Sequence, residues 1–237
     1  MKNLKFFLLL IIGFAFSNVQ SQTFENPYDY IGVDHNEGMK FLLENLKSKP
    51  SNKTAKATII GILKRKYKDS STHSAFESFP DMPTNDELLL QIRNNCSESL
   101  YNEVVDVKNI ILNGDNLNLL LEKLKEKERT ANRRLSGNDL QLYLMFIAGT
   151  KYSSIFWMPT AQGGENGIKY FQPKTSTEGG KRSTRSSSIF ISSRIYWGKV
   201  ILSDAFGGMI GGTFGGPAGA LSGLLMGSGM SIISQLP

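Results

Sequence analysis

Glycine recurs at every fourth position near the end of the chain, and this repeat limits what the segment can form. Six residues make up the repeat: Gly207, Gly211, Gly215, Gly219, Gly223 and Gly227. Positions i and i+4 share one face of an α-helix, so a helix here would carry a stripe without side chains. A second backbone can approach such a stripe closely, as in the small-residue interfaces of membrane helices. We therefore expect these glycines to form a surface for helix packing or membrane association.

The segment 200–236 can be interpreted in three ways. A single helix of this length would be about 55 Å long, which exceeds the ~30 Å hydrocarbon core of a bilayer. Gly215-Gly216-Pro217 would also interrupt it, since Gly is a poor helix former and Pro removes a hydrogen bond. A hairpin would use Gly216 as a cap and Pro217 as the first residue of a second helix. In the third interpretation, the hairpin stays in water and folds back on the rest of the chain.

The first 21 residues have the layout of a secretory signal peptide. Lys2 and Lys5 precede an apolar run from Phe6 to Phe16, and permissive residues follow at Val19 and Ser21. The run is too short to span a bilayer as a mature helix. We expect cleavage after Ser21 and export to the periplasm, the outer membrane or the extracellular space; an uncleaved anchor is the alternative.

Basic residues gather in two clusters, and the chain carries a net charge of +6. The segment from Lys47 to Lys68 holds eight basic residues and no acidic one, which is typical of a solvated helix face. The second cluster leads into the glycine segment and comprises Lys181, Arg182, Arg185, Arg194 and Lys199. Such residues favour anionic membrane surfaces by about 1 kcal/mol each, although plain solvation accounts for them equally well. In the absence of a nucleic-acid-binding motif, we expect no nucleic-acid partner.

Aromatic residues stand at the entrance to the glycine segment. Tyr196, Trp197 and Lys199 together predict an anchor at a membrane interface, where Trp and Tyr are enriched. The alternative is that both tryptophans of the chain fill a helical core, and for Trp157 we favour that interpretation.

The body of the chain has helical periodicity, which predicts an all-α fold: a helical bundle followed by a C-terminal Gly-rich helical hairpin. We expect a helical domain over 22–160, a flexible linker over 161–188 and a glycine-zipper apolar segment over 189–237. Residues 187–196 are the one stretch that could pair locally as a strand.

Individual helices are predicted from apolar spacing and capping residues. A first helix should follow residues 34–37 and end before Pro50. A second short helix should bury Ala57, Ile60, Leu63 and Tyr67. Residues 69–83 are polar and predict a loop. Thr84 and Glu87 form a capping box. Three later helices should each bury one apolar set: Leu100, Val104, Val107 and Ile111; Leu117, Leu120, Leu121 and Leu124; and Leu140 to Ile147. We expect Asp115 to cap the second of these helices.

The sequence offers little that could carry catalysis. Cys96 is the single cysteine, and we interpret it as a half-buried structural thiol. His35 lies in Asp34-His35-Asn36-Glu37, but four consecutive side chains point in different directions, and these residue types are expected as helix caps. His73 stands in a serine-rich stretch. No nucleophile elbow, metal-ligand spacing or phosphate loop is present, so we expect no enzyme, no catalytic residue, no metal and no cofactor.

The run Gly207-Gly208-Met209-Ile210-Gly211-Gly212-Thr213-Phe214-Gly215-Gly216 resembles the glycine-zipper segments of small bacterial envelope proteins and of some pore-forming bacteriocins. The opening Asn-Pro-Tyr-Asp-Tyr-Ile-Gly (26–32) is similar to exported bacterial proteins that end in such tails. The resemblance covers about 35 residues of tail and implies membrane association without an activity; Pro217 departs from the pattern.

These observations predict an exported bacterial cell-envelope protein whose tail associates with membrane, or self-associates into a homo-oligomer through the glycine stripe. Two alternatives stay open. One is a soluble secreted helical binding module with the hairpin packed in its core, and the other is a bacteriocin-like protein that permeabilises membranes.

Overall fold

The computed structural model describes residues 24–81, 83–171 and 195–236. Within these ranges it contains helices and no strand, so the predicted all-α fold is confirmed. The α-helices are α2 (Asp29–Asn45), α3 (Asn52–Lys66), α4 (Ser70–Ser78), α5 (Asn85–Asn95), α6 (Glu98–Leu112), α7 (Leu117–Thr130), α8 (Gly137–Trp157) and α10 (Trp197–Gln235). Three short 3₁₀ turns complete them: η1 (Ala131–Arg133), η2 (Thr160–Gln162) and η3 (Gly167–Tyr170). The predicted leader and most of the second basic cluster lie outside the described residues.

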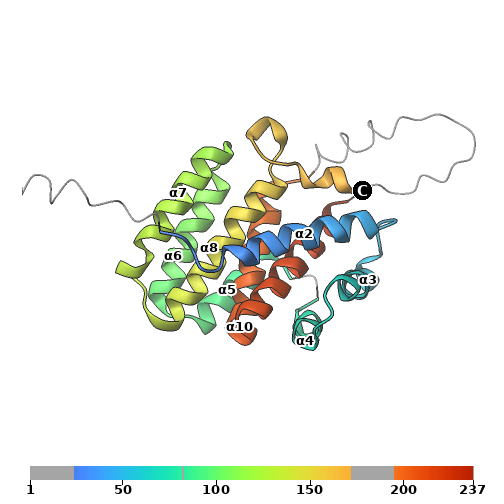
Figure 1. Ribbon diagram of the computed structural model, residues 1–237, viewed down its shortest axis with the longest axis horizontal. Helices are drawn as coiled ribbons and strands as arrows, with labels where there is room; N and C mark the ends of the chain where they lie inside the picture. The colour runs from blue at the N-terminus through green and yellow to red at the C-terminus, as the bar shows by residue number, and fades with distance from the viewer. Residues whose placement is uncertain (1–23, 82, 172–194, 237) are drawn as a thin grey trace, which may run out of the picture.

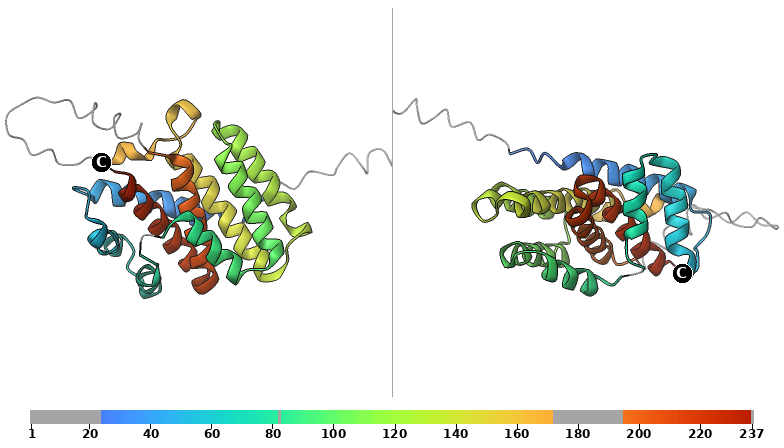
Figure 2. Two further views of the ribbon diagram at one scale, coloured as in Figure 1. Left: turned by 180° about the vertical axis from the view of Figure 1, so that it is seen from behind. Right: turned by 90° about the horizontal axis from the view of Figure 1, so that it is seen from below.

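The helix α10 is a hairpin of two arms. Its backbone leaves the helical conformation at Gly216, where φ is 56° and ψ is −144°, and Pro217 begins the second arm. A positive φ costs glycine little, and a proline needs no backbone partner in the first turn of a helix. We call residues 197–215 the first arm and 217–235 the second arm; they lie side by side (Figures 1 and 2). The interpretation as a single helix is therefore wrong, and the tail is a hairpin.

The hairpin lies at the centre of the molecule. The helices α2, α3, α4, α5, α6 and α8 all contact it, and the views in Figures 1 and 2 show them around both arms. Every residue of the ranges 200–210 and 219–233 is buried. The apolar residues of both arms belong to the same hydrophobic cluster as those of α2 to α8. The tail thus shares one core with the helices that precede it in sequence.

The helix α2 begins earlier than predicted. The turn at Asn26-Pro27 starts it, because the Asn26 side chain accepts a hydrogen bond from the Tyr28 N–H (2.9 Å) and the Asn26 carbonyl accepts one from the Asp29 N–H (3.1 Å). His35 consequently lies inside the helix rather than before it, and it is fully buried. The interpretation of residues 34–37 as helix caps was wrong.

One further expectation in this region was wrong, and another was right only in part. Residues 69–83 are not a loop, because Ser70–Ser78 form α4, which is capped by Asp69 and buries Phe76. Their serine-rich composition concealed the helix, whose main apolar contact is a single phenylalanine. The helix α3 buries Ala55, Ile59, Ile62 and Leu63, whereas Ala57 is exposed. Of the four residues predicted to be buried, Leu63 is buried, Ile60 and Tyr67 are half-buried, and only Ala57 is exposed. The prediction was right in part, because α3 carries apolar residues on several faces.

The remaining helices follow the sequence closely. The capping box of Thr84 and Glu87 is present, and α6 buries all four of its predicted residues. The helix α7 is capped by Asn116, not by Asp115. Residues 161–171, the start of the predicted linker, fold into η2 and η3 and bury Ile168 and Phe171.

Candidate functional site

The glycine repeat forms the contact between the two arms. Gly207 faces Gly223, and Gly211 faces Gly219. A Cβ atom added at Gly211 would lie 2.7 Å from the carbonyl carbon of Gly219, closer than real Cβ contacts allow. Gly227 approaches the backbone of Ser203 in the same way, so five of the six glycines serve a close backbone approach. These contacts are all within one chain.

Gly215 differs from the other five glycines. A Cβ added there would meet nothing within 4 Å, and the residue is exposed beside the hairpin turn. It therefore offers a position where a side chain can be introduced without separating the arms.

The three predicted anchor residues lie in different surroundings. Trp197 is partly buried and stacks on Trp157, with ring centroids 6.0 Å apart. Trp157 itself is fully buried, as the core interpretation predicted. Tyr196 is 57% exposed. Lys199 is exposed too, and its backbone carbonyl accepts a hydrogen bond from Asn85 (3.1 Å).

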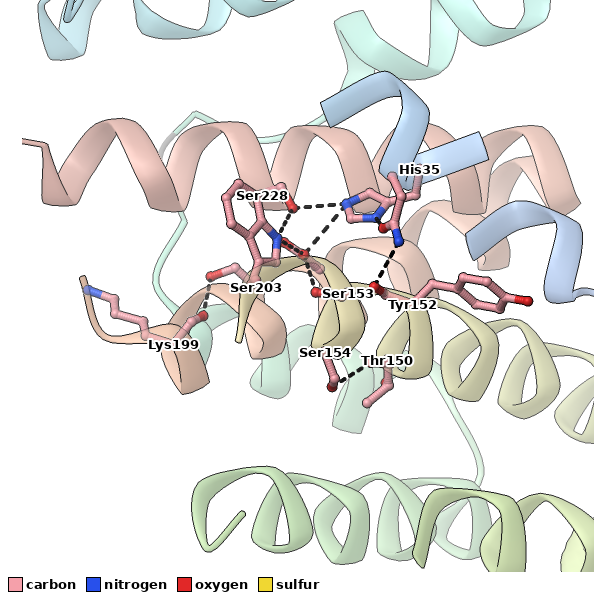
Figure 3. Close-up of polar contacts among 11 residues, drawn as sticks. His35, Thr150, Tyr152, Ser153, Ser154, Lys199, Ser203 and Ser228 are labelled. Atoms are coloured by element: carbon pink, nitrogen blue, oxygen red, sulfur yellow. Dashed lines mark hydrogen bonds and ion pairs between the residues drawn. The ribbon is translucent and has the colours of Figure 1, made fainter. Parts of the chain in front are cut away.

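Five polar side chains meet inside the molecule, and we call them the polar cluster: His35, Ser153, Trp157, Asp204 and Ser228. They come from α2, α8 and both arms of the hairpin, and all of them are fully buried. Figure 3 shows the polar contacts around His35, Ser153 and Ser228. The Asp204 Oδ2 accepts hydrogen bonds from Ser153 Oγ and from Trp157 Nε1 (2.9 Å). His35 Nε2 lies 3.0 Å from Ser228 Oγ and 3.5 Å from Asp204 Oδ2.

The hydrogen bonds of Asn36 fix the tautomer of His35. The Asn36 amide donates to the carbonyl of Tyr152 (3.0 Å), so its Oδ1 faces His35 Nδ1 at 3.0 Å as an acceptor. Nδ1 therefore carries the proton, and in neutral His35 the Nε2 atom accepts from the Ser228 hydroxyl.

Burial controls the charge of the two titratable groups. It lowers the pKa of His35 to about 4 and raises the pKa of Asp204 to about 8. Both groups are consequently uncharged near neutral pH, as expected for ionisable side chains without access to water. The Asp204 Oδ1 makes no hydrogen bond to the described residues.

The contacts Ser228–His35–Asn36 match the order of a nucleophile, a base and an orienting group. Catalysis also needs access for a substrate and donors for a developing negative charge. These side chains are enclosed on all sides, and Ser228 Oγ lies 3.2 Å from the indole N–H of Trp157. We interpret the polar cluster as structural, because it ties α2 and α8 to the hairpin.

The sequence contains one indication of the polar cluster. Asp204 is the single acidic residue of segment 189–237, and an isolated acidic residue in an apolar segment indicates a buried polar contact.

The first basic cluster is partly neutralised by acidic neighbours. Lys56 pairs with Asp81 (3.1 Å), Lys64 with Glu77 (2.5 Å) and Lys66 with Glu37 (3.4 Å), all at the surface. These exposed pairs are consistent with a solvated helix face.

An open groove lies between α4, α5 and the end of the hairpin, and we call it the tip groove. Its volume is about 680 Å³. Glycines of both arms form part of its lining, and Phe214, 77% exposed, stands beside the turn. The opposite wall carries Ser71, Ser74 and Ser78 of α4, and no charged side chain lines the groove. Sequence reasoning missed this groove because it treated residues 69–83 as a loop.

The other predicted residues do not assemble into a chemical site. Cys96 is half-buried, and burial raises the pKa of its thiol. His73 lies 2.7 Å from the carbonyl of Tyr67. Across the described ranges, no group of three or more His, Cys, Asp or Glu side chains is arranged to hold a metal ion.

Among the helices that the structure describes, α10 is the one with a length and composition compatible with crossing a membrane, and most of it is buried within the protein. Comparison of the chain with protein-family models, curated proteins and solved structures gives no match.

Proposed function

We propose that the chain is an exported bacterial cell-envelope protein that acts as a water-soluble helical binding module, with the glycine-packed hairpin as its core. The burial of both arms by six other helices carries this proposal. A hairpin that already packs against protein on most of its surface has little apolar area left to offer to lipid.

The polar cluster supports the same function. Insertion into a bilayer would separate Asp204 and Ser228 from His35, Ser153 and Trp157. An Asp at the centre of a membrane helix costs about 2.5–3.5 kcal/mol on insertion scales, before any lost hydrogen bond is counted. Within the bundle these groups already have partners.

Fractionation without detergent tests the proposal. The full-length chain, expressed in a bacterium, should be recovered in a soluble exported fraction, with an N-terminus at Gln22 by mass analysis. The purified protein should stay at the bottom of a density gradient when mixed with phosphatidylcholine–phosphatidylglycerol vesicles. Recovery in the membrane fraction and flotation with vesicles would contradict a water-soluble module, and retention of Met1 would contradict cleavage.

A second candidate function is membrane contact through the hairpin tip, as the glycine-zipper resemblance implies. The observation that favours it is the exposure of Phe214 at the end of an apolar segment. If the tip touches lipid, Phe214→Ser should reduce flotation with anionic vesicles, whereas Leu119→Ser on α7, where Leu119 is 57% exposed, should not. Release of an entrapped dye by the wild-type chain would instead support the permeabilising alternative.

Self-association through the glycine stripe is a separate proposal. Five of the glycines already face the opposite arm of the same chain, which leaves Gly215 to meet a second copy. Sedimentation equilibrium decides this point, and the hairpin geometry favours a monomer.

A further inference from the structure

We propose that the tip groove binds a single-chain amphiphile with an uncharged, hydroxyl-bearing head group. This inference rests on the proposed function as a binding module and names the class of ligand.

The dimensions of the tip groove suit one small molecule. Its volume of about 680 Å³ lies within the range of about 300–1,000 Å³ that is usual for such sites. Glycine positions on both arms supply a lining without side chains, next to Ile210 and Phe214 of the first arm. Phe79 and Pro80 continue the apolar surface toward α5, where Gln91 adds one polar side chain to the lining. This lining matches an unbranched alkyl chain, which needs apolar contact and no specific polar partner.

The α4 wall of the tip groove favours a ligand whose head group donates hydrogen bonds. Three serine hydroxyls stand along it, and each already donates within the chain: Ser71 to Asp69 Oδ1 (2.6 Å), Ser74 to the carbonyl of Ser70 (3.1 Å) and Ser78 to the carbonyl of Ala75 (3.0 Å). Their oxygens are left as acceptors, which match a ligand that donates O–H groups. A carboxylate or ammonium head would find no charged partner in the lining, whereas a hydroxyl head can donate to the serine oxygens and exchange hydrogen bonds with the amide of Gln91.

Binding can be measured with N-phenyl-1-naphthylamine, an uncharged dye that fluoresces more strongly in apolar surroundings. Wild-type protein should raise its fluorescence in a saturable manner. Monododecanoylglycerol, used below its aggregation concentration, should displace the dye, and dodecanoate and dodecyltrimethylammonium should be at least tenfold weaker competitors. Saturable dye binding without displacement by monododecanoylglycerol, or equal displacement by all three, would overturn the head-group assignment.

A matched pair of glycine substitutions locates the site. Gly215→Phe places a ring in the tip groove, at a position where an added Cβ meets nothing within 4 Å. Gly61→Phe adds the same ring to the exposed face of α3, at a position equally free of neighbours. We expect the first variant to weaken dye binding at least tenfold and the second to leave it unchanged. Ala75→Phe repeats the test from the α4 wall and avoids the hairpin turn.

The outcomes separate this inference from the proposed function. Unchanged binding in both Gly215→Phe and Ala75→Phe would overturn the tip groove as the site. A wild-type protein that is soluble and monomeric but does not bind the dye would also refute the inference, while leaving the soluble module intact. A protein found only with membranes would refute the proposed function itself.

Discussion

The Asp204 carboxyl lies between an imidazole, an indole N–H and a serine hydroxyl, and its proton links the stability of the fold to pH. In the folded chain the His35–Asp204 pair holds one proton, on Asp204, between about pH 4 and about pH 8. The unfolded pair also holds one proton between the ordinary pKa values of 3.8 and 6.5, but on the histidine. The two states therefore bind equal numbers of protons from about pH 4 to 6.5, and the contributions of the pair to the pH dependence cancel there.

Above pH 6.5 this balance ends, because the unfolded pair has lost its proton whereas folded Asp204 keeps it. The raised pKa of Asp204 means that its contribution to stability is lost as pH rises toward 8. At 1.36 kcal/mol per unit, the wild-type chain should lose about 2 kcal/mol relative to Asp204→Asn, whose side chain stays neutral. Urea unfolding at several pH values between 6.5 and 8.5 measures the difference. Parallel curves for the two chains would show that Asp204 is ionised in the fold.

The effect of a Gly→Ala substitution on stability depends on whether another backbone lies next to the glycine. Gly211→Ala should destabilise the fold by about 1–3 kcal/mol, because the new Cβ meets the backbone of the other arm, which cannot move aside as a side chain would. Gly61→Ala should stabilise it by about 0.5–1 kcal/mol, since alanine is the better helix former and α3 leaves room for it. Thermal and urea unfolding of both variants provide the test. A stabilised Gly211→Ala would show that the arms do not pack as closely as described.

At the scale of elements, the formation of α4 depends on its N-cap, because its serine-rich sequence has a low helix propensity. The Asp69 carboxylate accepts hydrogen bonds from Ser71 Oγ and from the Thr72 N–H, and these hold the pKa of Asp69 down to about 2. The cap is thus fully formed above about pH 4 and is lost as pH falls through 2.

Asp69→Ala should accordingly cost about 1 kcal/mol of stability, the usual value for a lost N-cap, whereas Asp69→Asn should cost less because it still accepts a hydrogen bond. Urea unfolding at pH 7 compares the two. Because α4 forms one wall of the tip groove, amide hydrogen exchange in Ser70–Ser78 should also increase in the alanine variant alone. Equal stability of Asp69→Ala and wild type would mean that tertiary contacts hold α4 without its cap.

At the scale of the whole molecule, the hairpin supplies the surface on which the other helices assemble. The helices α2 and α8 contact each other and both contact α10, and α4 and α5 pack on α10 as well. A chain ending at Tyr196 should therefore lose cooperative unfolding, because the buried faces of α2, α4, α5 and α8 would be left without their partner. Circular dichroism and limited proteolysis measure this loss. The full-length Phe214→Ser variant is the control, because it changes an exposed residue of the tail and keeps the hairpin. A cooperative melt of the shortened chain would make the hairpin an appended segment.

Much of the secondary structure could be read from the sequence, and the misses have physical causes. The capping box at Thr84 and the faces of α6 and α7 were predictable because local hydrogen bonds and apolar spacing decide them. The helix α4 was not, because the hairpin that buries its Phe76 side is more than 100 residues away in sequence. His35 was misread for the same reason: Ser228, its partner, is 193 residues distant.

By itself the sequence determined that the tail is a hairpin with a glycine face, since Gly216-Pro217 sets the turn and a four-residue glycine spacing sets the stripe. It could not determine what covers the rest of the hairpin, because an apolar helix satisfies its backbone internally whether lipid or protein surrounds it. Only the tertiary structure decided that α2, α3, α4, α5, α6 and α8 provide the cover. The deciding contacts are between partners distant in sequence, above all the buried bonds that Asp204 accepts from α8.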